Sequence, residues 1–469
     1  MHLFYPSMGK QMQGFTDRIW AEHALLADGW ASGVSLCHDK GRITDVQVAT
    51  PPDPDAMRVG ALLPASANLH SHAFQRAMAG LTEQRGPDPR DSFWTWRQLM
   101  FRFLDQLTPD DVQAITAFVQ MQMLEAGYGA VAEFHYLHHA PGGASYANLA
   151  EMSERIVAAA DQTGIGLTLL PVLYQYGGCD QRALGPGQIR FGNDLERFSR
   201  LVEGAETALG ALPSDALLGI APHSLRAVSR EALAASIMLR PDQPLHMHLA
   251  EQPAEVEEVL QACGARPVEW LLANADVDSR WCLIHCTQMH RHETQALAAT
   301  GAVAGLCPIT ESSLGDGIFD GIAYRDAGGR WGIGSDSNIR ISLSEELSTL
   351  DYSQRLRDHS RAVFATEQKS TGRILLESAA QGGAQATGRD GGVLSVGKLA
   401  DLVALDTTHI DLDGCAGDTI LDAFVFAADD RAITDVWSAG RHVVSGGRHM
   451  HHDAISAAYR AVVRRLRNV

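Results

Sequence analysis

Eight short apolar runs that alternate with helix-like stretches constrain the fold of this 469-residue chain more than any other feature. Stretches such as 109–127 and 253–264 separate the runs and carry apolar residues at helical spacing. Eight strands alternating with helices over about 250 residues or more are typical of a (β/α)8 TIM barrel, an α/β fold. We therefore predict such a barrel over residues 65–385. Its strands are expected within 61–72, 129–138, 165–175, 217–225, 244–251, 281–286, 301–308 and 330–338.

The two ends of the chain have a different pattern. Residues 16–64 and 390–447 contain short segments of alternating apolar and polar residues, separated by glycine turns. This pattern predicts antiparallel strands. We expect the ends to pair into a small β-sandwich domain, with residues 1–64 as its first part. Residues 386–469 would supply its second part and a C-terminal tail, in which the histidines of 449–452 are interpreted as solvated.

Charge and cysteine usage exclude several classes of partner and location. The net charge is −18, and an acidic surface argues against a nucleic-acid partner. Seven scattered cysteines without a CxxC pair indicate a reducing compartment rather than a disulfide framework. The first residues do not have the pattern of a signal peptide, and no apolar run is long enough to span a membrane. We therefore expect a cytoplasmic protein that binds neither nucleic acid nor membrane.

Polar residues of one chemical kind lie at the ends of the predicted strands. His70 and His72 end the first run, and residues two apart on a strand point to the same side. Two such imidazoles can hold one metal ion, although an HxH pair alone is weak support. Three later runs carry further candidates at the barrel face where active sites form. These candidates are His246, His248, Glu251, His285 and Asp336.

The residue types suit one task. Neutral imidazoles and a carboxylate favour zinc or a similar divalent ion. A catalytic site of this kind leaves one position open for water, which then ionises near neutral pH. A neighbouring Asp and His can take up and return protons. Spacing alone leaves both His246 and His248 open as the ligand from the fifth run.

With these motifs the sequence resembles the metal-dependent deaminases of the amidohydrolase superfamily. The shared set is H-S-H at 70–72, H-x-x-E at 248–251, His285 and S-D-S-N at 335–338. Segment 392–406 resembles the β-sandwich segment that is common to the superfamily. A narrower resemblance, to the N-formimino-L-glutamate deiminase family, rests on segments 68–80, 93–97, 133–139, 221–228, 248–252, 285–290 and 334–343.

The resemblance implies a single divalent metal ion, usually Zn²⁺. Its implied ligands are His70, His72, His248 and Asp336. The H-x-x-E motif selects His248, and His246 is then interpreted as a structural strand residue. Relatives with two metal ions use a carbamylated lysine, but no lysine lies between Lys40 and Lys369. Glu133 is the alternative bridging carboxylate.

The resemblance also implies a substrate and a mechanism. The substrate would be the dicarboxylate N-formimino-L-glutamate, hydrolysed to N-formyl-L-glutamate and ammonia in histidine degradation. Asp336 and His285 would help to deprotonate the attacking water, and Glu251 would carry a proton to the departing nitrogen. The implied substrate-binding residues are Gln75, Arg97, Tyr136, His223 and Arg226, with Arg76 as a competitor for a carboxylate role.

Two other functions stay open at this point. The first is another deaminase on the same barrel, such as one acting on guanine. The second is a metal-binding scaffold without activity. Family analogy further suggests a homodimer.

Overall fold

The computed structural model describes residues 17–83 and 93–467 of the chain. The first 16 residues of the predicted β-sandwich part, and the last two of the tail, therefore lie outside the described residues. No described helix has both the length and the apolar character needed to cross a membrane.

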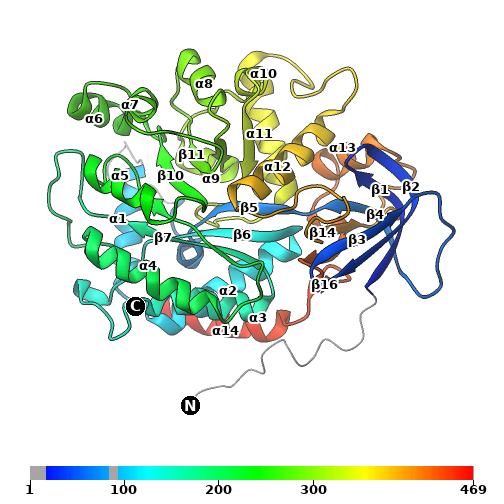
Figure 1. Ribbon diagram of the computed structural model, residues 1–469, viewed down its shortest axis with the longest axis horizontal. Helices are drawn as coiled ribbons and strands as arrows, with labels where there is room; N and C mark the ends of the chain where they lie inside the picture. Colours follow the sequence, from blue (N-terminus) through cyan, green and yellow to red (C-terminus); the bar gives the residue numbers. More distant parts are fainter. Residues whose placement is uncertain (1–16, 84–92, 468–469) are drawn as a thin grey trace.

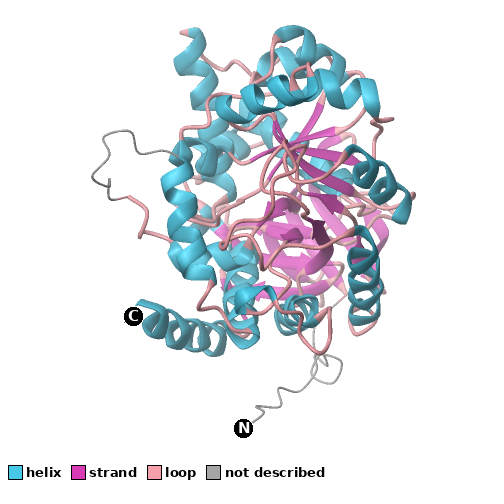
Figure 2. Ribbon diagram, turned by 90° about the vertical axis from the view of Figure 1, so that its left-hand side faces the viewer, coloured by secondary structure: helices cyan, strands magenta, loops and turns pink. Residues whose placement is uncertain are grey.

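A closed parallel barrel forms the centre of the molecule, as predicted (Figure 2). The four-stranded and five-stranded parallel sheets join through bridges between Ile220 and Leu245 and between Ser71 and Asp336. The barrel strands are β5 (Ser66–Ser71), β6 (Tyr128–His135), β7 (Gly166–Leu173), β8 (Leu217–Leu218) with β9 (Ala221–Pro222), β10 (Leu245–Leu249), β11 (Trp281–His285), β12 (Val303–Leu306) and β13 (Arg330–Ile333). Every residue of the barrel strands except the first residue of β8 and of β13 is buried, because side chains fill the barrel and helices cover its outside.

Helices follow the strands and surround them. Several begin at a side chain that accepts a hydrogen bond from the first turn, such as Thr108, Ser229, Ser342 and Ser370. The helices are α1 (Phe93–Leu104), α2 (Pro109–Glu125), α3 (Glu151–Thr163), α4 (Leu195–Leu209), α5 (Arg230–Leu239), α6 (Pro253–Cys263), α7 (Pro267–Asn274), α8 (Arg291–Ala298), α9 (Pro308–Leu314), α10 (Gly321–Asp326), α11 (Leu343–Asp358) and α12 (Thr371–Ala386). Short 3-10 helices are η2 (Ala73–Met78) and η3 (Pro141–Gly143).

The two ends of the chain meet in a second sheet beside the barrel (Figure 1). Its spatial order is β17-β16-β15-β14-β4-β1-β2-β3, so the N-terminal and C-terminal halves are hydrogen-bonded directly through β4 and β14. This confirms a β domain built from both ends. Its strands are β1 (Arg18–Leu26), β2 (Gly29–Asp39), β3 (Arg42–Gln47), β4 (Met57–Pro64), β14 (Leu402–Leu405), β15 (Ile433–Ser438), β16 (Arg441–Ser445) and β17 (Arg448–His449).

The C-terminal segment also returns to the barrel. Helix α13 (Asp418–Phe426) packs on α11 and α12, η4 spans Asp430–Ala432, and α14 (His452–Arg467) lies against α2, beneath it in Figure 1. The ring of Tyr459 stacks on Phe118 at 3.9 Å between centroids. His449 is buried and contacts the Thr163 carbonyl, so its interpretation as a solvated residue is wrong. The domain boundaries at residues 65 and 385 stay a proposal. Helices α13 and α14 follow residue 385 in the sequence but pack on helices of the barrel.

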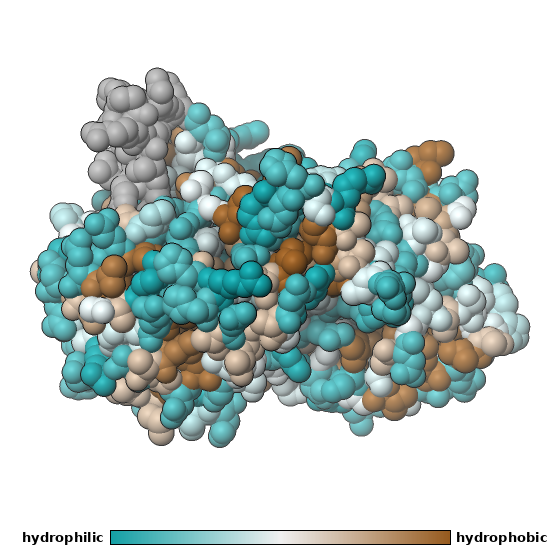
Figure 3. Space-filling model, turned by 90° about the horizontal axis from the view of Figure 1, so that it is seen from above, coloured by the Kyte–Doolittle hydropathy of each residue, from teal (hydrophilic) through white to brown (hydrophobic). Residues whose placement is uncertain are grey.

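The surface on the side of α8 and α10 intersperses hydrophilic residues with small apolar groups (Figure 3). Large exposed apolar side chains, such as Leu356 and Met238, occur on separate helices. Scattered apolar residues are normal on a protein surface, so this face does not by itself indicate a docking site.

Candidate active site

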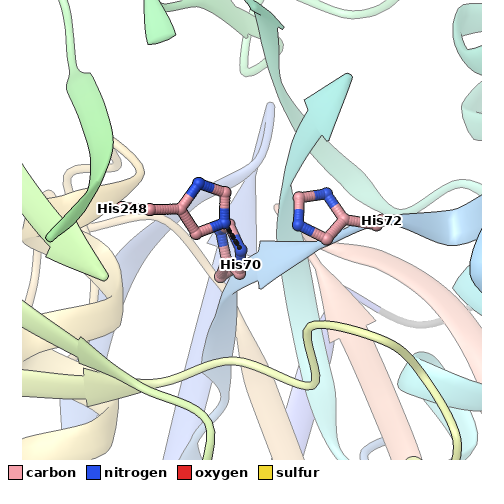
Figure 4. Close-up of side chains that lie close together, drawn as sticks. All are labelled: His70, His72 and His248. Atoms are coloured by element: carbon pink, nitrogen blue, oxygen red, sulfur yellow. Dashed lines mark hydrogen bonds between the residues drawn. The ribbon is translucent and has the colours of Figure 1, made fainter. Parts of the chain in front are cut away.

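The closing contact of the barrel brings the first group of polar residues together. The His72 amide donates to the Asp336 carbonyl at 2.9 Å, and the Asp336 amide donates to the His70 carbonyl at 2.9 Å. These bonds connect the end of β5 to the end of β13. His248, on β10, reaches the same point from across the barrel, and Figure 4 shows the three imidazoles turned toward one another.

The ligand atoms of four residues converge. Nε2 of His70 lies 3.1 Å from Nε2 of His248 and 3.5 Å from Oδ1 of Asp336. Nε2 of His72 lies 3.2 Å from the same Oδ1. Ligand atoms of a tetrahedral zinc site, with bonds of about 2.0–2.1 Å, are about 3.3 Å apart. The spacing therefore fits one small divalent ion.

Hydrogen bonds turn the lone pairs of two of these histidines into the site. Nδ1 of His72 contacts the Phe134 carbonyl at 2.9 Å, and Nδ1 of His248 contacts the His223 carbonyl at 3.1 Å. A carbonyl only accepts, so Nδ1 carries the hydrogen in each ring and Nε2 is left as an acceptor. Burial lowers the pKa of both imidazoles, which favours the neutral form that a metal ion requires. The donor set thus fits a metal ion in chemistry as well as in spacing.

His246 lies on the same strand but takes another partner. Its Nε2 donates to the Ala386 carbonyl at 2.7 Å. Residues two apart on a strand are separated by about 6.6 Å along it, so His246 lies further than His248 from the strand end. It is not among the residues whose ligand atoms converge.

Glu133 also has a bond of its own. Its carboxylate accepts from the Ala73 amide at 2.7 Å, and burial raises the pKa of Glu133 to about 7. It is not in the converging sets among the described residues. The structure therefore gives no support for Glu133 as a bridge between two metal ions.

A second group of ionisable residues lies next to Asp336. Nε2 of His285 is 3.8 Å from Oε1 of Glu251 and 3.9 Å from Oδ2 of Asp336. Burial raises the pKa of Glu251 to about 7, so this carboxyl group can both hold and release a proton near neutral pH. Burial alone would lower the pKa of His285, but the surrounding carboxylates raise it well above its ordinary value. The arrangement can therefore move protons beside the candidate metal ligands.

The backbone at these strand ends is unusual. Ala250, His285 and Asp336 have φ angles of +52°, +72° and +47°, in the left-handed region that side chains other than glycine seldom adopt. Such positions cost about 1–3 kcal/mol each and gather at functional sites. Here they redirect the chain at the end of β11 and just beyond the ends of β10 and β13.

A pocket opens beside these groups. Most of its lining side chains are polar or charged, and Trp96, Met100, Phe191 and Leu314 supply apolar wall between them. All five predicted substrate-binding residues line it: Gln75, Arg97, Tyr136, His223 and Arg226. Gln75 donates to the Tyr136 hydroxyl at 2.7 Å.

The two arginines of the pocket differ from their competitor Arg76. One Nη of Arg76 donates to the carbonyls of Asn338 and Ile339, both at 2.7 Å, and Arg76 does not line the pocket. Arg226 is buried; although burial acts against its charge, Glu255 and Glu251 raise its pKa. It therefore keeps its charge inside the pocket.

Sequence reasoning missed several supporting residues. Glu311, on α9, lies 3.2 Å from Nδ1 of His285 and accepts the Cys307 amide at 2.8 Å. A buried network of Asn68, Ser335 and Asn338 connects β5 to the end of β13. Asn68 and Asn338 lie within the motifs at 68–80 and 335–338. Their closeness in sequence to the candidate metal ligands is the one sequence signal that could have identified them. Glu311 has no such motif.

The fold and the converging residues define a barrel hydrolase with a candidate metal centre, and the chain belongs to the amidohydrolase family, whose profile matches residues 61–443. It is thus a metal-dependent hydrolase of carbon–nitrogen bonds.

Similar proteins narrow this class. The chain is 45% identical over 451 residues to a formimidoylglutamate deiminase of Pseudomonas aeruginosa, covering 96% of this chain and 99% of that protein. It is 26% identical to an 8-oxoguanine deaminase of the same organism, covering 92% and 94%. The structure is similar to a crystal structure of an amidohydrolase from Brucella melitensis, with a TM-score of 0.93, 47% identity and coverage of 96% and 100%. An adenosine deaminase from Xanthomonas campestris with bound zinc shares the fold at a TM-score of 0.80 and 21% identity, covering 97% and 99%.

Proposed function

We propose that this chain is a zinc-dependent deiminase that hydrolyses N-formimino-L-glutamate to N-formyl-L-glutamate and ammonia, as a step of histidine degradation. One observation carries the proposal: three members of the candidate metal set, His72, His248 and Asp336, line the same pocket as two arginines. The 45% identity to a formimidoylglutamate deiminase supports the same substrate.

The metal ion would be held by His70, His72, His248 and Asp336. When bound, it lowers the pKa of a water ligand, so that an attacking oxygen is generated near neutral pH. Neutral imidazoles with a single carboxylate suit zinc, which is the reason to name this ion.

Three side chains would orient the water and move the protons. Oδ2 of Asp336 takes a proton from the attacking water, and Nε2 of His285, 3.9 Å from this oxygen, orients that water. Its oxygen adds to the formimino carbon. Glu251, 3.8 Å from the same imidazole nitrogen, carries a proton to the terminal nitrogen of the substrate. The second proton of the water is passed to the same nitrogen, the bond from carbon to that nitrogen breaks, ammonia leaves, and the former water oxygen remains as the formyl oxygen.

The arginines would hold the substrate. N-formimino-L-glutamate carries two carboxylates, and the planar guanidinium group of arginine binds a carboxylate through two parallel hydrogen bonds. Arg97 and Arg226 supply these donors, while Gln75, Tyr136 and His223 line the space between them and the metal set. A planar purine would instead favour aromatic and amide contacts.

The test is ammonia release by purified protein whose metal content is known. We expect zinc at about one ion per chain and turnover of N-formimino-L-glutamate well above that of guanine or 8-oxoguanine. Faster turnover of a purine would contradict the proposed substrate. A zinc-loaded protein that turns over none of these compounds would favour the alternative of a metal-binding scaffold without activity. The expected cytoplasmic location and homodimer stay predictions, the latter open to light scattering.

A further inference from the structure

We propose that Tyr174 is a further substrate-binding residue, which donates its hydroxyl hydrogen to a carboxylate of the substrate. The inference rests on the proposed function and concerns the arginine end of the pocket. Tyr174 follows the last residue of β7 and lines the same pocket as Arg97 and Arg226. None of the sequence motifs pointed to it.

The hydrogen bonds of Tyr174 leave one part of its hydroxyl group unused. Arg97 donates to the phenol oxygen at 2.7 Å, and Gln188 donates to it at 2.9 Å. A guanidinium group cannot accept a hydrogen bond. The amide of Gln188 is oriented by the Gly185 amide, which donates to its Oε1 at 3.0 Å and leaves Nε2 for Tyr174.

A phenol has two lone pairs and one hydrogen. Both lone pairs of Tyr174 are taken by these two donors, so its own hydrogen is the part left to donate. Among the side chains and backbone groups that the structure describes, none accepts a hydrogen bond from this hydroxyl group. Tyr174 is 4% exposed, so bulk solvent does not replace the missing acceptor.

The direction of this hydrogen follows from the surroundings. The ring of His223 lies 4.5 Å and that of Phe191 lies 5.6 Å from the ring of Tyr174, and all three line the pocket. With Arg97 and Gln188 on the phenol oxygen, the pocket interior is the remaining space. A group bound there meets donors from Arg97, Arg226 and Tyr174, and a carboxylate, which only accepts, satisfies them.

Replacing the hydroxyl by hydrogen tests the proposal. Tyr174→Phe keeps the ring that packs on His223 but removes the donor. We expect KM for N-formimino-L-glutamate to rise about tenfold or more, since a hydrogen bond to a charged group is lost, with kcat within about twofold. Tyr176→Phe makes the same change two residues further on, outside the pocket, and should leave KM unchanged.

A second role of the hydroxyl, orienting Arg97, has to be separated from direct binding. In the Arg97→Met background, Tyr174→Phe should still raise KM. If the effect disappears there, Tyr174 acts only through Arg97 and the proposal is overturned.

Substrate analogues give an independent measurement. N-formimino-4-aminobutyrate lacks the α-carboxylate, and N-formimino-L-2-aminobutyrate lacks the side-chain carboxylate. For one of the two, the Tyr174→Phe effect should vanish, because the carboxylate that Tyr174 contacts is missing. An equal effect on both analogues would refute a contact with one carboxylate.

Binding of the product N-formyl-L-glutamate by calorimetry keeps the test separate from catalysis. We expect Tyr174→Phe to weaken binding by the same factor as KM, with zinc content and Tm unchanged. If wild-type protein does not turn over N-formimino-L-glutamate, the proposed function fails, and the calorimetry still decides on Tyr174. If wild-type protein is active and both KM and product binding survive the substitution, only the Tyr174 assignment fails.

Discussion

At the scale of single residues, the pocket places very similar groups in very different chemical roles. Glu251 and Glu255 lie four residues apart, and Glu255 accepts a hydrogen bond from the Glu251 amide at 2.9 Å. Glu255 thereby holds the backbone, whereas the carboxylate of Glu251 faces His285 in the pocket. Environment, rather than residue type, decides which carboxylate can move a proton.

The proton-transfer role of Glu251 is open to a direct test. Glu251→Gln preserves the shape of the side chain but cannot carry a proton. We expect kcat to fall by about 100-fold to 10,000-fold, the usual contribution of general acid–base catalysis, with zinc content unchanged. Steady-state kinetics and metal analysis check this.

The matched control is Glu257→Gln, an exposed position on α6. It should have wild-type kinetics. Near-normal turnover by Glu251→Gln would remove Glu251 from the proton path.

At the scale of elements, the register of a strand decides which histidine reaches the metal set. His246 and His248 point to the same side of β10, yet one bonds the Ala386 carbonyl and the other approaches His70. The ladder with β11, in which His248 pairs with Ile284, fixes this register. A shift by one residue would turn both histidines away.

Two glutamine substitutions compare these positions. We expect His248→Gln to lose most of its bound zinc, because an amide is a poor zinc ligand. His246→Gln can still donate to Ala386, so it should retain about one ion per chain and lose only some stability. Metal analysis after gel filtration measures both, and the reverse result would exchange the roles of the two histidines.

The sequence predicted these strands well but not their supporting contacts. The strand ends can be recognised as apolar runs followed by His, Glu or Asp, because each of these residues lies close to the end of its own strand in the sequence. Glu311 and Tyr174 have hydrogen-bond partners on other elements, so no spacing signal identifies them. The left-handed backbone conformation of Asp336 could not be predicted either. The residue type at this position is set by the chemistry of the site and not by the backbone conformation.

At the scale of the whole molecule, a buried ion network connects the barrel to the second sheet. Arg389 binds Asp401 through two hydrogen bonds of 2.9 and 2.8 Å and also donates to Asp215, which precedes β8. Arg441, on β16, donates to both carboxylate oxygens of Asp215, at 2.7 and 2.8 Å. The four side chains balance their charges away from water, so each depends on the others.

Removing one partner should therefore be strongly destabilising. Arg389→Met leaves Asp401 and part of Asp215 without a counter-charge, and we expect a loss of about 3–5 kcal/mol in the free energy of unfolding. Urea denaturation followed by circular dichroism measures it. Arg182→Met, which removes an exposed arginine paired with Asp180, is the control and should leave the urea midpoint nearly unchanged. Equal midpoints for both variants would mean that the network does not hold the two parts together.

The contact between Ser71 and Asp336 joins the two ends of the barrel, so residues near its first and last strands both contribute to the proposed metal site. In the proposed site, two imidazoles at the end of the first barrel strand and one carboxylate that follows the last strand hold the same ion. On this proposal, a nascent chain that has not yet reached residue 336 lacks one of the zinc ligands. A growing polypeptide would therefore retain the ion only once the barrel closes. Bound zinc would stabilise the closed barrel relative to open folding intermediates.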